Sequence, residues 1–199
     1  MYYIPDERDH GLPHDPLKAL VTPRPIGWIS SVDANGVVNL APYSFFNLLS
    51  ERPAYVMFSS AGPKDSLRNI EATGEFVCNL AGAALFEEML ASSAAYPAGR
   101  SEPEHLDIAM RESRWVTPPS VAAAHAALEC AHHETVELPG SGYRMVIGRI
   151  LGVYIDDKVI VDGLVSSTLI RPVSRLGYLD YSITEQTFAR PRPPVPALD

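Results

Sequence analysis

A long hairpin pattern in the second half of the sequence constrains the fold more than any other feature. Residues 126–138 and 143–155 both have the composition of strands, and the turn-forming residues 139–142 (Pro-Gly-Ser-Gly) separate them. Gly148 and Gly152 stand inside the second run, where glycine marks a bend or a bulge. Two long strands that return on each other and bend predict the wall of a β-barrel.

Shorter patterns predict the rest of the barrel. Four further strands are expected over residues 26–32, 37–40, 54–59 and 75–80, with a short turn at 33–36 between the first two. Helices are expected over 65–73, with Asp65 or Ser66 as N-cap and Gly74 as the stop, over 83–92, and as a short turn near 105–110. The sequence therefore predicts a mainly β fold, a Greek-key or related barrel with peripheral helices.

The length of 199 residues favours a single domain over the whole chain, 1–199. Residues 1–21 are punctuated by prolines and predict an extended N-terminal arm, and residues 188–199 predict a proline-rich C-terminal tail of polyproline type. No apolar run approaches the roughly 18 residues of a membrane span. The irregular segment 93–120 is long for a loop, so a lid or a dimer arm is expected there.

Two features of the sequence bear on the compartment. The N-terminus lacks a basic region that leads into an apolar segment, so no signal peptide is expected. Cys78 and Cys130 lie in apolar strand-like runs, where cysteine is typical of a core in a reducing compartment. A cytoplasmic location is therefore expected.

The net charge of −8 limits the partners of the chain. It results from 16 basic and 24 acidic residues, and neutralising phosphates needs a positive face, so neither a nucleic acid nor an anionic membrane is an expected partner. Because the chain is acidic overall, a local group of basic residues is informative. Arg24, Lys64 and Arg68 form such a group within residues 22–69. Lys64 is one of only three lysines.

That stretch contains a candidate anion site. Ser59 and Ser60 end a predicted strand, Gly62-Pro63 forms a turn, and Lys64 precedes a helix whose first N–H groups and dipole favour an anion. Such a junction predicts a phosphate site, although an ordinary strand–turn–helix junction has the same pattern. Neither a dinucleotide-binding G-x-G-x-x-G nor a P-loop motif occurs.

Candidate groups for catalysis or metal binding are sparse elsewhere. Phe45 and Phe46 are adjacent on an extended segment, so one could line a ring pocket or a subunit interface, unless both faces are buried. His10 and His14 have helical ligand spacing that Pro13 disfavours, and no nucleophile–base pair or metal cluster is expected. A cofactor would have to supply any redox chemistry.

Ordered motifs along the chain resemble the flavin reductase-like, FMN-binding split-barrel family. The residues that carry the resemblance are Val21–Ile26, Val38–Asn47, Lys64–Ile70, Gly74–Leu80, Ala127–Cys130, Val146–Arg149 and Arg171–Gly177. The resemblance implies a homodimer of split β-barrels with FMN near the interface. It also implies reduction of flavin by NADH or NADPH, and onward transfer to an electron-acceptor or monooxygenase partner.

The resemblance also implies site residues. Arg24, Pro25 and Ile26 would border the flavin, and Arg175 could approach it from the late segment. The ring and ribityl chain would contact Ser44, Phe45, Phe46 and Asn47, with Asn79 as a further candidate. The phosphate would be held by Ser59, Ser60, Lys64 and Ser66.

One position departs from the family pattern. Short reductases of this kind often carry a histidine on the nicotinamide side, just before the strand at 144–148, and this chain has Tyr143 there. The leading hypothesis is an FMN-dependent NAD(P)H:flavin oxidoreductase that passes hydride from nicotinamide to flavin and on to an acceptor. The alternatives are a non-enzymatic, FMN-bound electron carrier and a flavin-binding module.

Overall fold

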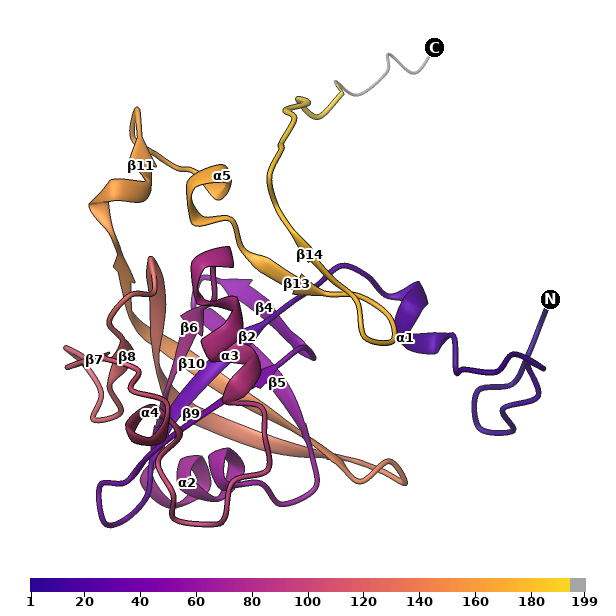
Figure 1. Ribbon diagram of the computed structural model, residues 1–199, viewed down its shortest axis with the longest axis horizontal. Coiled ribbons are helices and arrows are strands. Elements are labelled where there is room, and N and C mark those ends of the chain that lie inside the picture. Colours follow the sequence, from indigo (N-terminus) through magenta and orange to yellow (C-terminus); the bar gives the residue numbers. More distant parts are fainter. Residues whose placement is uncertain (194–199) are drawn as a thin grey trace.

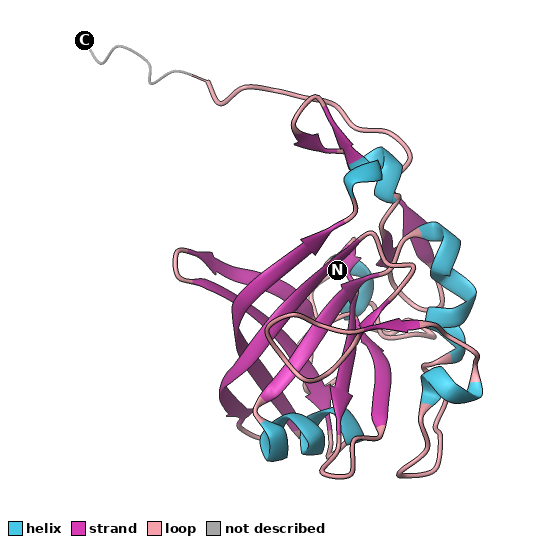
Figure 2. Cartoon of the chain, turned by 90° about the vertical axis from the view of Figure 1, so that its left-hand side faces the viewer, coloured by secondary structure: helices cyan, strands magenta, loops and turns pink. Residues whose placement is uncertain are grey.

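A seven-stranded antiparallel sheet forms the body of the protein in a computed structural model, which describes residues 1–193. The sheet curls into a barrel (Figures 1 and 2). Its order is β3-β2-β6-β9-β10-β5-β4. The strands are β2 (Gly27–Val32), β3 (Val38–Tyr43), β4 (Phe46–Glu51), β5 (Ala54–Ala61), β6 (Glu75–Leu80), β9 (Ala126–Leu138) and β10 (Tyr143–Ile155).

The order of the strands confirms the mainly β, Greek-key prediction. In the main sheet β6 pairs with β9, and β9 pairs with β10. The other edge of β10 pairs with β5, a strand that comes earlier in the sequence. The edge strands β3 and β4 do not pair with each other, so the barrel is open on that side. The arrangement is that of a split barrel.

The long hairpin is present as the sequence predicts. Strands β9 and β10 pair in antiparallel register, with shifts at Ile147/Gly148 and at Ile150/Gly152. The two glycines therefore mark bulges, and packing explains why they are small: a Cβ would collide with the ring of Phe76 at Gly148 and with the ring of Trp115 at Gly152. Bulges at these points bend the wall of the barrel.

Helix α2 (Asp65–Thr73) plugs one end of the barrel. Leu67 and Ile70 are buried in a core cluster that also contains Phe58 and Phe76. The helix ends at Gly74 in the left-handed conformation, as predicted. The N-cap prediction was wrong, because Lys64 occupies that position without a side-chain cap bond.

The remaining helices are short and differ from prediction in detail. The expected helix over 83–92 is a 3-10 turn (Ala83–Leu85) followed by α3 (Phe86–Ala91). The turn expected near 105–110 lies earlier, as α4 (Glu102–His105), because Ser101 precedes it and Pro103 fits its first turn. A second core cluster, with Trp28, Leu40 and Met89, lies between the sheet and α3.

The last part of the chain adds small elements that the sequence patterns did not indicate. Each is too short for a hydrophobic period to show. They are 3-10 turn Asp157–Val159, β11 (Ile160–Val161), β12 (Leu164–Val165), α5 (Ser167–Ile170), β13 (Val173–Arg175) and β14 (Tyr181–Ile183). Residues 188–193 form neither helix nor strand, and residues 194–199 of the expected tail lie outside the described residues.

A small second sheet joins the two ends of the chain. Strand β1 (Arg24–Pro25) pairs with β13, and β13 with β14, so the order is β1-β13-β14. Helix α1 (Leu17–Leu20) lies beside this sheet, and the N-terminal arm extends from it away from the barrel (Figure 1).

The segment 93–120 packs on the barrel wall. It contains the strand pair β7 (Met110–Arg111) and β8 (Ser120–Val121). The buried carboxylate of Glu129 on β9 accepts hydrogen bonds from the backbone N–H groups of Arg114 and Trp115, at 2.9 and 2.6 Å. These bonds fix the segment against the sheet.

Candidate functional site

A cleft of about 330 Å³ lies where the main sheet meets the small second sheet. This volume is at the lower end of the range for small-molecule sites, roughly 300–1,000 Å³. Strands β1, β3, β5, β10, β13 and β14 contribute to its lining, as do α1 and α3. The predicted site residues that line it are Arg24, Ile26, Ser44, Phe45, Ser59, Lys64, Tyr143 and Arg175.

One part of the cleft lies at the junction of β5 and α2. Lys64 precedes the helix, and its ammonium lies 5.5 Å from the centre of the Tyr43 ring. The backbone N–H of Ser59 donates to the carbonyl of Phe45 at 2.8 Å, which joins the two predicted binding segments. The side chain of Lys64 makes no ion pair with any carboxylate of residues 1–193.

Tyr43 is a cleft residue that the sequence analysis missed. Its side chain is buried against Phe58, with ring centres 4.6 Å apart, yet its hydroxyl has no hydrogen-bond partner among the described residues. Burial raises the pKa of this hydroxyl above its ordinary value, although the hydroxyls of Ser66 and Ser60, near it but outside hydrogen-bond geometry, oppose this effect. Strand alternation could have found the residue, because Tyr43 and Phe45 are two positions apart on an extended segment.

An aromatic pair forms a wall of the cleft. The rings of Phe45 and Tyr143 are 5.7 Å apart and tilted by 41°. The guanidinium of Arg24 lies 5.9 Å from the Phe45 ring, on the side of the small sheet. The wall can therefore contact a flat ring, with a cation beside it.

Arg24 is held in place by backbone carbonyls. Its two terminal nitrogens donate to the carbonyls of Lys18, Val21 and Leu176, the last two at 2.7 Å. The residue is only 7% exposed, and its Nε has no partner among the described residues. Burial, and then the nearby charge of Arg175, lower the pKa of Arg24 below its ordinary value.

Arg175 stands next to Arg24 in the small sheet. The two residues are direct partners in the β1–β13 register. The Arg175 guanidinium lies 4.4 Å from the centre of the Tyr181 ring and donates to the carbonyl of Tyr178. Lys18, Tyr178 and Tyr181 line the cleft here, and no sequence motif singled them out.

Three predicted site residues have buried side chains outside the cleft lining. The Asn79 amide donates to the Trp28 carbonyl and the Ser30 hydroxyl, and its oxygen accepts from the backbone N–H of Val121. Ser66 accepts from the amide of Asn39 at 2.8 Å. Ser60 is fully buried, with a weak contact of 3.5 Å to the Gly62 carbonyl.

The other predicted residues outside the lining are Pro25, Phe46 and Asn47. Pro25 and Asn47 are exposed, and the Asn47 side chain accepts from the backbone N–H of Leu48. Phe46 packs against the core cluster and beside Gly27. Phe45 therefore lines the cleft, whereas Phe46, which the resemblance also assigned to the flavin, packs on the core.

The segment 93–120, expected as a lid, reaches the cleft only at its start. Ser93 lines the cleft. Residues 96–105 instead border two other hollows, of about 200 and 470 Å³. Among residues 1–193 no group of three or more His, Cys, Asp or Glu side chains could hold a metal ion. No helix in that range is long and apolar enough to cross a membrane.

Comparisons with known proteins agree with this geometry. A protein of Deinococcus radiodurans is 36% identical over 185 residues, which cover 86% of this chain and 81% of that protein. The structure is similar to nitrilotriacetate monooxygenase component B from Bacillus cereus, with a TM-score of 0.87, 26% identity, and coverage of 96% and 98% of the two chains. It is also similar to 2-nitrobenzoate 2-nitroreductase from Pseudomonas fluorescens, with a TM-score of 0.79, 29% identity, and coverage of 91% and 89%.

The sequence profile of one family spans most of the elements that build the cleft. It matches residues 20–167, which include β1, the barrel strands and α2. Together with the split-barrel topology, this match shows that the chain belongs to the flavin reductase like domain family.

Proposed function

We propose that this protein is an FMN-binding oxidoreductase, and that FMN occupies the cleft between the main and the small sheet. One observation carries the proposal. In a chain with a net charge of −8, the described cleft lining contains four cationic residues and no carboxylate. It also contains an aromatic wall. A ligand with an anionic end and a flat ring suits this arrangement.

The Lys64 region suits the phosphate of FMN. Lys64 supplies a charge, Ser59 can supply a hydroxyl, and the first N–H groups of α2 favour an anion. The unpartnered hydroxyl of Tyr43 adds a buried donor beside them. A donor left unpaired in a buried place costs free energy, which a ligand oxygen would offset.

Phe45 and Tyr143 suit the ring of the flavin. When bound, the flavin would accept hydride from a reduced nicotinamide and pass electrons on. The chain would hold the ring against Phe45, exclude water with the buried face of the cleft, and tune the ring with the charge of Arg24. Tyr143 is a half-buried residue of the cleft lining and could contact the nicotinamide of NADH or NADPH.

An acceptor or partner enzyme completes the proposed reaction. The Bacillus cereus neighbour is a component of a monooxygenase, and the Pseudomonas fluorescens neighbour is a nitroreductase. These names support transfer from the flavin either to a second enzyme or to a small organic acceptor. We further propose that the protein acts as a homodimer, as the family resemblance implies.

Spectroscopy of the purified protein tests the proposal. A bound flavin gives an absorbance band in the visible region, and we expect one FMN per chain. Mixing with NADH or NADPH in a stopped-flow cuvette should bleach this band faster than the uncatalysed reaction. Absence of bound flavin after reconstitution would refute the whole proposal. Binding of FMN without faster bleaching would instead favour the non-enzymatic electron carrier. Tyr143 is compatible with that alternative, because it replaces the histidine that short reductases often carry on the nicotinamide side.

Replacing Lys64 tests the phosphate region separately. Lys64→Ala should weaken FMN binding about tenfold, because a charge-assisted contact is lost, and should leave riboflavin binding nearly unchanged. Fluorescence titration of the apoprotein measures both. Lys158→Ala, in a 3-10 turn away from the cleft lining, is the matched control. Undiminished FMN affinity would contradict the assignment of the phosphate to Lys64.

A further inference from the structure

A cluster of three cations, Lys18, Arg24 and Arg175, lies in the part of the cleft formed by α1 and the small sheet. Here it is called the Arg175 end. It belongs to elements other than those near Lys64. Figure 1 shows α2 at the lower end of the barrel, β13 above the barrel strands, and α1 to the right of β13. Arg175 is the charged neighbour that affects the pKa of Arg24.

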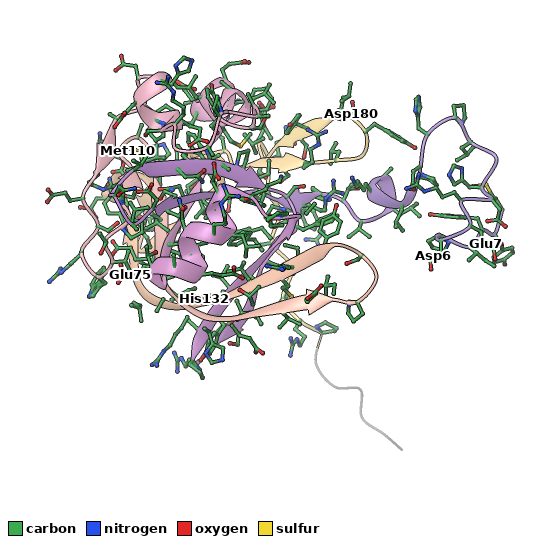
Figure 3. The ribbon with its side chains drawn as sticks, turned by 90° about the horizontal axis from the view of Figure 1, so that it is seen from below. Asp6, Glu7, Glu75, Met110, His132 and Asp180 are labelled. Carbon is green, nitrogen blue, oxygen red and sulfur yellow. The ribbon has the colours of Figure 1, made fainter. Side chains whose placement is uncertain are left out.

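No carboxylate compensates the Arg175 end within residues 1–193. The ion pairs there join Arg68 to Asp65, His125 to Asp156, Arg144 to Glu71, and Arg171 to Glu185. Figure 3 shows Asp180 on the β13–β14 side and Asp6 and Glu7 far out on the N-terminal arm. None of these three side chains pairs with a cation of the cluster.

This arrangement has an energetic cost. Arg24 is 7% exposed, and its Nε has no hydrogen-bond partner among the described residues. Its charge is held beside that of Arg175, and like charges held close in a partly desolvated place repel each other. Carbonyl oxygens satisfy the terminal nitrogens of Arg24 but bring no net negative charge. An anion at the Arg175 end would offset the repulsion.

The surroundings of the cluster indicate what kind of anion fits. Tyr181 lies under the Arg175 guanidinium, and Tyr178 and Phe45 also line this part of the cleft. Aromatic side chains beside cations suit a flat, apolar body that carries an anionic group.

We infer that the Arg175 end binds the anionic group, a phosphate or a carboxylate, of the second substrate that meets the flavin. This inference rests on the proposed function and names the class of substrate: an anionic aromatic or heteroaromatic compound. Two sources share this chemistry. One is the phosphates of a reduced nicotinamide dinucleotide, and the other is an aromatic carboxylate that accepts electrons.

Two charge-removing variants test the inference in the FMN-loaded protein. Arg175→Gln and the exposed Lys18→Gln remove charge from the Arg175 end, and Lys158→Gln is the matched control. In the first arm, KM is measured for NADH and for NADPH. In the second arm, the flavin is reduced with dithionite and its reoxidation by 4-nitrobenzoate is compared with reoxidation by the neutral 4-nitrobenzamide.

We expect Arg175→Gln to raise KM for an anionic substrate about tenfold in at least one arm, because a charge-assisted contact is lost. Lys18→Gln should act in the same direction. The neutral amide should react at the same rate in all variants. The arm that responds identifies the source of the anionic group. If neither arm responds in either variant, the inference is overturned.

A binding control separates this inference from the proposed function. Affinities of the apoprotein for FMN and for riboflavin should be unchanged in Arg175→Gln. If the variant weakens FMN selectively, the Arg175 end holds the flavin phosphate, which overturns the inference while the proposed function stands. If wild-type protein binds no flavin, the proposed function itself fails.

Discussion

Tyr43 illustrates how a single residue can combine a core role with a site role. Its ring packs on Phe58 in the barrel core, the residue lines the cleft, and its buried hydroxyl has no hydrogen-bond partner among the described residues. This hydroxyl keeps its proton and can donate, because tyrosine is neutral near pH 7 and burial raises its pKa further. Tyr43 is therefore a stronger phosphate candidate than Ser60 or Ser66, which do not belong to the cleft lining.

Tyr43→Phe should weaken FMN binding about tenfold, since a hydrogen bond to a charged group is lost while the packing is kept. Riboflavin affinity and the thermal unfolding midpoint should change little. Fluorescence titration and calorimetry provide the three measurements. Tyr55→Phe, on β5 but outside the cleft lining, is the control. Equal weakening of FMN and riboflavin would show that the hydroxyl does not serve the phosphate.

Gly148 is a second residue whose role depends on a neighbour. Gly148→Ala should destabilise the protein by about 1–3 kcal/mol, because the new Cβ collides with the Phe76 ring. Urea unfolding measures this change. Adding Phe76→Leu should remove part of this loss of stability, because the effects of substitutions at contacting residues are not additive. Strictly additive effects would show that the collision is not the cause.

At the scale of elements, buried carboxylates fasten irregular segments to the sheet. Glu129 holds residues 114 and 115, and Glu102 on α4 accepts a hydrogen bond from the backbone N–H of Leu40 at 2.9 Å. A segment expected as a lid is thereby fixed to the wall. The prolines and the length of segment 93–120 predicted an irregular backbone. They could not predict where the segment packs, because its hydrogen-bond partners lie on β3 and β9.

Glu102 gives the stability of the protein a pH dependence. Burial raises the pKa of Glu102 above 4.5, although the hydrogen bond from Leu40 opposes this effect. The folded state then holds its proton more tightly than the unfolded state, so this group lowers stability as pH rises through the window from about 4.5 up to its folded pKa.

Glu102→Gln should remove this dependence. As pH rises from 4, wild type should lose unfolding free energy relative to the variant, and the difference should level off above the folded pKa. Urea unfolding at a series of pH values measures it. Glu104→Gln, an exposed position on the same helix, should show no such trend. A constant difference between wild type and Glu102→Gln would contradict the burial argument.

At the scale of the whole molecule, the hairpin of β11 and β12 stands away from the main sheet (Figure 2). Its four residues Ile160, Val161, Leu164 and Val165 are all apolar and exposed, Leu164 by 73%. A two-stranded hairpin alone is marginally stable in water. A second copy of the chain, as in the proposed homodimer, would cover it.

Leu164→Asp combined with Val165→Asp should therefore weaken the dimer at least about tenfold, because charges would enter an apolar interface. Analytical ultracentrifugation over a dilution series measures the association constant. Tyr2→Asp, on the exposed N-terminal arm, is the control. A wild-type monomer at all concentrations would refute the homodimer, whereas an unaffected dimer would exclude only this hairpin.

Sequence patterns missed the edge strand β4, whose residues are mostly exposed, but they predicted the other six strands of the main sheet, the helix ending at Gly74, and the segments that carry Phe45, Ser59 and Lys64. These features are local, since they depend on alternation, turn residues and caps within a few positions of each other. Even the bulges at Gly148 and Gly152 were marked by residue type alone.

Which polar residues face the cleft depends on contacts between distant parts of the chain. Asn79 and Ser66 have suitable chemistry, but neighbouring strands and loops occupy their hydrogen bonds. Lys18, Tyr43 and Tyr181 belong to the cleft because segments far apart in sequence meet there. The pairing of Arg24 with Arg175 across about 150 residues is likewise invisible to any local pattern. Long-range packing, rather than residue type, placed the charges.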